Sequence, residues 1–169
     1  MSALSTNYLT LSGREEAWRF TPLKRLAGLH DLAVPVKDLI SINLVGQPRT
    51  GFKLETIDAT KIAPISKTDD VIVQRVRETA TKVVHLQIDK EAVISEPIFL
   101  KRNASGEKEF SRTVITAAPH SKATVVVENV GHALLGEEIE IRVESGANLT
   151  FITLQEWSGD SIHLGRHMR

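Results

Sequence analysis

The sequence predicts a mainly β chain that begins with short helices, and three observations support this fold class. Helix-start signals are confined to the first 80 residues, whereas apolar and polar residues alternate with a period of two over most of the chain after that point. A strand, corner and strand pattern over residues 113–127 recurs over residues 137–151. One rung of a β-solenoid has this pattern, and so do two hairpins of a β-sandwich. A β-solenoid and an α+β fold with a β-sandwich therefore both stay open at this point.

Short helices are expected close to the N-terminus. A capping box, S-x-x-E, begins at Ser12 and predicts a helix through Phe20. Thr21-Pro22 is a second start signal, because threonine caps helices well and proline fits their first position, and it predicts a helix to Leu26.

A third helix is expected after a run of capping residues. Thr68-Asp69-Asp70 provides a cap and places negative charge in the first turn. The apolar residues that follow lie at helical spacing, and they are Ile72, Val73, Val76 and Ala80.

Strands account for most of the remaining chain. They are expected at residues 40–44, 52–54, 83–88, 92–94, 98–101, 113–117, 123–130, 138–143 and 149–155. Glycine and small polar residues interrupt the alternation at residues 103–106 and 131–136, which predicts loops there.

The recurring pattern predicts a register for stacked rungs. An offset of 24 residues aligns Ser121 with Ser145 and Val125 with Leu149. A single rung cannot bury its apolar face, so rungs must stack on neighbours. Residues 161–169 resemble the opening of another strand, which would leave an unpaired edge. We expect either that the chain is the N-terminal piece of a longer protein or that two copies meet at this edge.

Composition excludes several classes of function. The chain has no cysteine, which excludes a disulfide framework, a thiolate metal site and a cysteine nucleophile. Its 21 basic and 21 acidic residues cancel and are scattered, so we expect no nucleic-acid partner. No apolar run approaches the ~18 residues of a membrane span, and no signal sequence opens the chain. We therefore expect a soluble, cytoplasmic protein without a membrane partner.

No metal site is predicted, although histidines are present. His163 and His167 lie four residues apart, on one face of either a strand or a helix. Three further histidines lie in or next to expected strands, and they are His85, His120 and His132. No paired carboxylate at metal-ligand spacing accompanies them. One strand is instead expected to carry a solvated acidic face made of Glu137, Glu138, Glu140 and Glu144.

No catalytic or cofactor-binding residue is predicted either. The chain contains no G-x-S-x-G nucleophile motif and neither of the glycine-rich phosphate motifs. Glu156 and Asp160 have the residue types of a carbohydrate-cleaving pair, but the favoured interpretation is a polar turn, because no aromatic platform for sugars accompanies them. Trp18 and Phe20 are expected to anchor the first helix onto the sheet.

Three segments together resemble a known family. They are EEAWRFTPLKRL at residues 15–26, EPIFL at residues 96–100, and KATVVVENVG at residues 122–131 followed by IEIRVESGANLTFITLQEWSGDSIHL at residues 139–164. In this order they resemble the SufB/SufD family of iron–sulfur cluster assembly proteins, and within it the SufD branch.

The resemblance implies a truncated right-handed parallel β-helix, a form of solenoid, preceded by short helices. Residues 1–80 would form an N-terminal α/β region, and residues 81–169 the first rungs of a β-helix core that is incomplete at its C-terminus. None of the family's functional residues matches a position of this chain, so no partner-binding residue is predicted.

The resemblance also implies a function without catalysis. The chain would be a scaffold subunit fragment of the SufBCD iron–sulfur cluster assembly complex. The full-length protein would bind SufB and the ATPase SufC, and the parent complex would handle the cluster, and ATP through SufC, while this fragment holds no cofactor. A homodimer through the open β-helix end is a further expected contact. The alternative function is a carbohydrate-binding or carbohydrate-active β-helix domain.

Overall fold

The chain folds as a parallel β-solenoid in a computed structural model that describes residues 11–31, 33–38 and 42–169. The described helical elements are three 3-10 turns (η) and one α-helix: η1 Glu16–Trp18, η2 Leu23–Arg25, η3 Ala59–Lys61 and α1 Val71–Thr79. The strands are β1 Lys37–Asp38, β2 Ile42–Leu44, β3 Phe52–Asp58, β4 Lys82–Ile88, β5 Ile98–Ala117, β6 Lys122–Val143, β7 Asn148–Trp157 and β8 Ile162–Met168.

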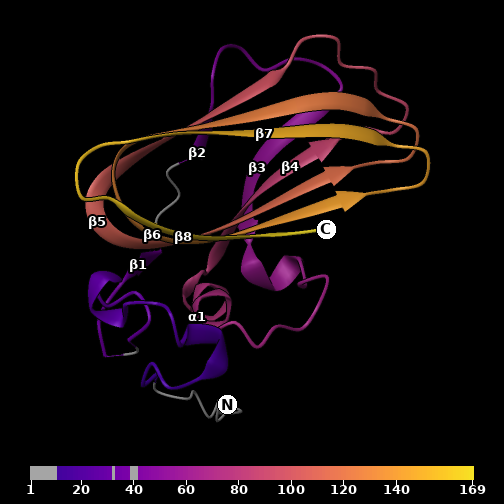
Figure 1. The fold of residues 1–169 in the computed structure, drawn as a ribbon. Coiled ribbons are helices and arrows are strands. Elements are labelled where there is room, and N and C mark those ends of the chain that lie inside the picture. Colours follow the sequence, from indigo (N-terminus) through magenta and orange to yellow (C-terminus); the bar gives the residue numbers. More distant parts are fainter. Residues whose placement is uncertain (1–10, 32, 39–41) are drawn as a thin grey trace.

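The long strands β5 and β6 each run through two layers. Their first halves lie with β2 and β7 in the layer that is uppermost in Figure 1, and their second halves lie with β4 and β8 in the lower layer. Strands β5, β6, β7 and β8 pair only in parallel with one another. This winding of about three turns confirms the prediction of a parallel β-helix, and it shows that the sandwich alternative was wrong.

Antiparallel strands occur only at the first-turn end of the described sheet. β2 pairs antiparallel with β5, and β3 pairs antiparallel with β4. Strands from both sides of residue 80 thus share one sheet. The proposed division of the chain at that residue stays a prediction.

The predicted loops at residues 103–106 and 131–136 were wrong, because both segments continue as strand within β5 and β6. They are the bends at which each strand passes from the upper to the lower layer (Figure 1). Gly106 and Gly131 have φ values of 84° and 91°, in the left-handed region that favours glycine. Glycine therefore allows the strand to bend, and the strand pairs with the next rung both before and after the bend.

The predicted offset between rungs was also wrong. β6 and β7 pair Thr124 with Thr150 and Val125 with Phe151, an offset of 26 residues in place of 24. The two offsets differ by two residues, and a strand shifted by two keeps each side chain on the same face. Alternation alone could not distinguish them.

The two predicted helices before residue 27 are shorter than expected. Each is a 3-10 turn of three residues, η1 and η2. Glu15 does accept hydrogen bonds from the backbone N–H and the hydroxyl of Ser12, at 2.9 and 2.8 Å. However, the Ser12 hydroxyl accepts from the Arg14 N–H at 3.3 Å, which closes a local turn and leaves the reciprocal half of the capping box unformed.

The third helix is confirmed as α1. Asp70 is its N-cap and accepts from the N–H groups of Ile72 and Val73 at 2.9 and 3.1 Å. Among the shorter strands, β2 accounts for residues 42–44 of the strand expected at 40–44, and residues 40 and 41 lie outside the described residues. The strand expected at 92–94 is reduced to an isolated bridge between Val93 and Lys122.

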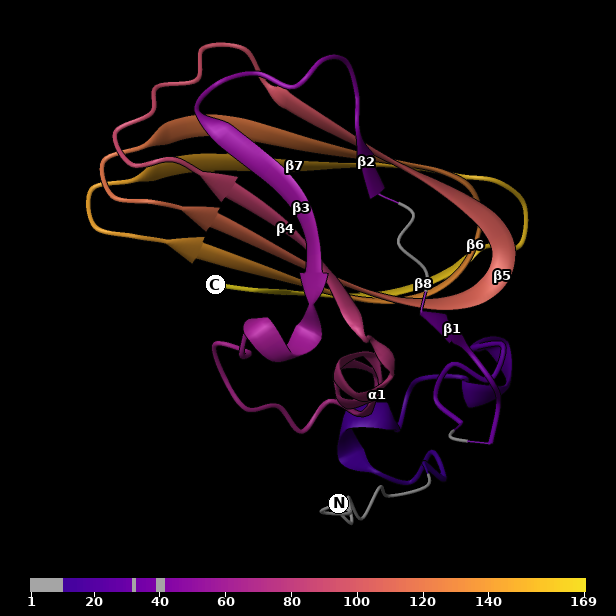
Figure 2. The ribbon, with the colours of Figure 1, turned by 180° about the vertical axis from the view of Figure 1, so that it is seen from behind.

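Three apolar clusters stabilise the described structure, and two of them lie close to the site. The first fills the solenoid between the two layers and includes Leu86, Leu100, Ile115, Val127 and Ile139. The second lies outside the lower layer, where α1 covers that face (Figures 1 and 2).

The second cluster contains Ile72 and Val76 of α1 packed with Leu29 and Phe110. Trp18 packs against this cluster, as expected, whereas Phe20 is 90% exposed and does not anchor the N-terminal segment. An aromatic anchor was therefore predicted correctly for only one of the two rings.

Candidate functional site

Side chains from successive rungs form an ion-pair network inside the solenoid. Arg102 on β5 donates to one oxygen of Glu137 on β6 at 2.5 Å and to the Ser111 hydroxyl at 3.2 Å. The other carboxylate oxygen of Glu137 lies 2.6 Å from Nε2 of His163 on β8. We call these four residues the interior network. It links β5, β6 and β8 at the level of the bends, where the apolar cluster ends.

Glu137 is ionised although it is almost fully buried. Burial raises the pKa of a carboxyl group, but the charge of Arg102 and the contacts of His163 outweigh this effect and lower the pKa of Glu137 to about 2. The side chains of Arg102 and Glu137 are 0% and 2% exposed. Two charges without access to water depend on each other, so we interpret the interior network as a structural element that fixes the stacking of rungs.

A second network lies under α1 and the segment before it. Glu138 accepts from Nε of Arg77 through both oxygens at 3.0 Å. Arg112 lies between the two carboxylates, 3.3 Å from Glu138 and 3.1 Å from Glu140. Arg142 completes the row by donating to Glu140 at 3.1 Å. Burial raises the pKa of Glu140, but hydrogen bonds and charge from Arg112 and Arg142 lower it overall.

The prediction of a solvated acidic face was therefore wrong for three of four residues. Glu137, Glu138 and Glu140 are buried, and Glu144 alone is exposed. Glu138 and Glu140 do point away from the interior, but α1 and residues 62–65 cover them. Arg142 is near Glu140 in the sequence, but Arg77 lies 61 residues from Glu138 and Arg112 lies 28 residues from Glu140, so the local pattern could not reveal these two partners.

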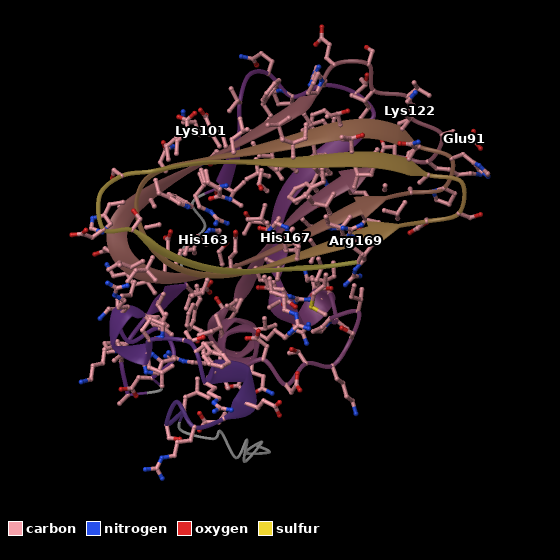
Figure 3. The ribbon with its side chains drawn as sticks, in the orientation of Figure 1. Glu91, Lys101, Lys122, His163, His167 and Arg169 are labelled. Carbon is pink, nitrogen blue, oxygen red and sulfur yellow. The ribbon has the colours of Figure 1, made fainter. Side chains whose placement is uncertain are left out.

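The histidines do not converge on one point. His163 and His167 lie along β8 (Figure 3), and four residues of strand separate them by about 13 Å. Each makes an edge-on ring contact, His163 with Trp157 and His167 with Phe151.

The remaining histidines that were considered are dispersed. His85 contacts the Thr116 hydroxyl at 3.0 Å, and burial together with the charge of Arg142 lowers its pKa. His120 and His132 are exposed. Within residues 11–31, 33–38 and 42–169, no group of three or more His, Cys, Asp or Glu side chains is arranged to hold a metal ion.

The free edge of β7 and β8 is a candidate contact surface. Both strands pair with β6 on one side, and no other strand of the described part of the chain pairs with their second side. A cavity of about 380 Å³ opens beside this edge (Figure 3 labels His167 and Arg169 there), and its lining includes Ile141, Val143, Leu149, Phe151 and Thr153. An unpaired edge next to an apolar opening can accept a further strand.

A small cavity near the interior network is less suited to a ligand. It lies between α1 and β8, has a volume of about 160 Å³, and is lined by Trp18, Ile72, Leu164 and Gly165. Ligand pockets usually measure about 300 to 1,000 Å³. Glu156 and Asp160 are exposed, and Asp160 lies in the turn between β7 and β8, as the polar-turn interpretation predicted. In the described residues, no helix has the length and apolar character needed to cross a membrane.

Fold and site together describe a parallel β-solenoid with ion-pair networks inside it and under α1, and comparisons with known proteins agree with this fold. Residues 99–168, which cover β5 to β8 almost completely, match the family model described as SUF system FeS cluster assembly, SufBD core domain. Iron–sulfur cluster assembly SufBD family proteins are similar to the chain in Mycobacterium leprae (28% identical over 160 residues) and in Mycobacterium bovis (23% over 157 residues). These matches support the resemblance of the chain to the SufB/SufD family.

The alignments cover most of this chain but less than half of each relative. Each alignment includes 92% of this chain but 40% of the relative, so the chain spans about two fifths of the length of the curated relatives it matches.

None of the residues in the interior network was predicted from the sequence as a site.

Proposed function

We propose that the chain belongs to a SufD-like, non-catalytic scaffold subunit that acts in iron–sulfur cluster assembly in the cytoplasm. The observation that carries this proposal is the coincidence of the family match, residues 99–168, with the parallel rungs from β5 to β8. Without cysteine the chain offers no thiolate, so a cluster would be cargo held by a partner's ligands. The proposed partners are SufB and the ATPase SufC.

The free edge of β7 and β8 is the proposed contact for SufB. Strand addition at such an edge satisfies its unpaired N–H and C=O groups, and the adjacent apolar opening supplies a place for side chains. A second copy of the chain is the competing occupant of this edge.

Co-purification with SufB and SufC from the same organism tests the proposal. The immobilised chain is expected to retain both proteins, and Val143→Glu at the opening is expected to weaken retention at least about tenfold, because a charge would be buried in the contact. Val93→Glu is the matched control, since Val93 is also exposed but pairs with Lys122 of β6, on the side opposite the free edge of β7. Failure of the wild-type chain to retain either protein, under conditions in which a full-length SufBD relative does, would contradict the proposal.

A further inference from the structure

A row of apolar side chains crosses the outer face of the upper layer. Phe99, Val126 and Ile152 are register partners on β5, β6 and β7. Val45 extends the row, since its N–H donates to the Phe99 carbonyl at 2.9 Å. We call these four residues the upper row. Val45, Phe99 and Ile152 are 52, 46 and 41% exposed, so apolar side chains reach solvent on three of these four neighbouring chain segments.

On the opposite face of the molecule, a helix covers the apolar side chains of the sheet. Outside the lower layer, Phe110 and Leu164 are covered by α1 through Ile72 and Val76. Figures 1 and 2 both place α1 below the lower layer and away from the upper one. No helix of the described chain covers the upper row.

A charged row runs beside the upper row. Lys101 and Glu128 are register partners one step further along β5 and β6, and their side chains meet at 2.8 Å. They are 37 and 31% exposed, so both still reach solvent. Figure 3 shows Lys101 on the outside of the upper layer. The positive charge is therefore on β5 and the negative charge on β6, at the same height along the strands.

The upper row and the charged row are each complementary to the same row of a second copy of the chain. Consider a two-fold axis that lies just outside the upper layer, parallel to the strands and above the line midway between β5 and β6. This axis places β5 of one copy over β6 of the other. Phe99, which protrudes, would then lie over the partner's Val126, which is only 6% exposed and lies lower between its neighbours. Lys101 would lie over the partner's Glu128. Each contact occurs twice, as in any isologous dimer.

We propose that the outer face of the upper layer is an isologous dimer interface between two copies of this chain. Sheets that stack face to face prefer aligned strands at about 10 Å, which is the arrangement that an axis parallel to the strands produces. The complementary charge pattern favours a second copy over an unrelated partner, since it needs no charge from elsewhere. This inference does not depend on the proposed role in cluster assembly.

Charge-reversal variants test the interface. Lys101→Glu gives a chain with two acidic residues in the charged row, and Glu128→Lys gives a chain with two basic residues. The wild-type chain is expected to sediment as a dimer, and each variant alone is expected to dimerise at least about tenfold more weakly, because like charges face each other twice. An equimolar mixture of the two variants is expected to form a one-to-one heterodimer, detected by native mass spectrometry.

The mixture separates contacts between copies from contacts within one chain. The pair between Lys101 and Glu128 inside each chain is broken in both variants, and mixing does not restore it, so recovery can arise only between copies. Lys61→Glu, on the exposed η3 turn, is the control and should leave the dimer unchanged. A monomeric wild type, a mixture that stays monomeric, or variants that dimerise as well as wild type through another surface such as the β7 and β8 edge would each overturn the proposal. Circular dichroism confirms that every variant is folded.

Discussion

Replacement of Arg102 by methionine is expected to lower the free energy of unfolding by about 3 to 5 kcal/mol. Arg102 is fully buried and supplies the positive charge that keeps the Glu137 carboxylate ionised inside the solenoid. Without it, Glu137 would retain only its hydrogen-bond contact with His163 and would lose most of the compensation for its burial. Urea denaturation at neutral pH, followed by circular dichroism, measures the loss.

The double variant Arg102→Met with Glu137→Leu distinguishes the loss of the ion pair itself from the cost of leaving the Glu137 charge buried without a counter-charge. Because it removes both buried charges and keeps similar volumes, most of the lost stability is expected to return. Lys37→Met is the surface control: Lys37 and Glu107 form an ion pair with side chains about half exposed, and its loss should cost less than about 1 kcal/mol. If Arg102→Met alone cost no more than this control, the interior network would not be a structural element.

Substitution of Gly131 by alanine is expected to cost about 2 to 5 kcal/mol, because it combines two effects. Gly131 has a φ of 91°, which is strained for alanine by about 1 to 2 kcal/mol. A Cβ at this position would also lie 2.4 Å from the carbonyl oxygen of Ala104 on the neighbouring rung, and relieving this clash requires movement of the backbone. Thermal or urea denaturation of the variant measures the sum.

Gly46 provides the matched control for this substitution. Its φ of 90° is almost the same, but a Cβ there would meet no atom within 4 Å. Gly46→Ala should therefore show only the backbone strain, about 1 to 2 kcal/mol. Equal losses in the two variants would mean that the close approach of rungs at the bend adds nothing.

The element types of this fold were predictable because local chemistry determines them. Asp70 caps α1 through its own side chain, and alternation from Lys82 onward identifies strands whichever partners they pair with. The choice between parallel rungs and antiparallel hairpins was different, since it depends on which strands become neighbours. For the same reason the strand bends at Gly106 and Gly131 were mistaken for loops: glycine signals a change of direction, but does not tell whether pairing continues through it.

The candidate site was less predictable than the fold. Glu138 and Glu140 occupy outward positions, and only the packing of α1 over the lower layer turns them into buried ion-pair partners of Arg77 and Arg112. Arg102 and Glu137 occupy inward positions of an otherwise apolar interior, and their 35-residue separation carries no local signal. Charged residues at inward-facing positions of two strands were the one hint that could have been used.

Both proposed interfaces depend on the parallel stacking of rungs, in which β6 and β7 pair at an offset of 26 residues. The chain has no cysteine, so introduced pairs report the register directly. Thr124 and Thr150 are register partners on β6 and β7, whose Cα atoms are about 4.8 Å apart in a paired sheet, within disulfide range. Thr124 and Asn148 correspond to the offset of 24 residues and would be about 8 Å apart.

Oxidation of the two double-cysteine variants, followed by mass spectrometry of the intact chain, compares the two registers. We expect that Thr124→Cys with Thr150→Cys forms an intramolecular disulfide readily, while Thr124→Cys with Asn148→Cys stays reduced under the same conditions. A disulfide that forms in the second variant and not in the first would contradict the register of β6 and β7.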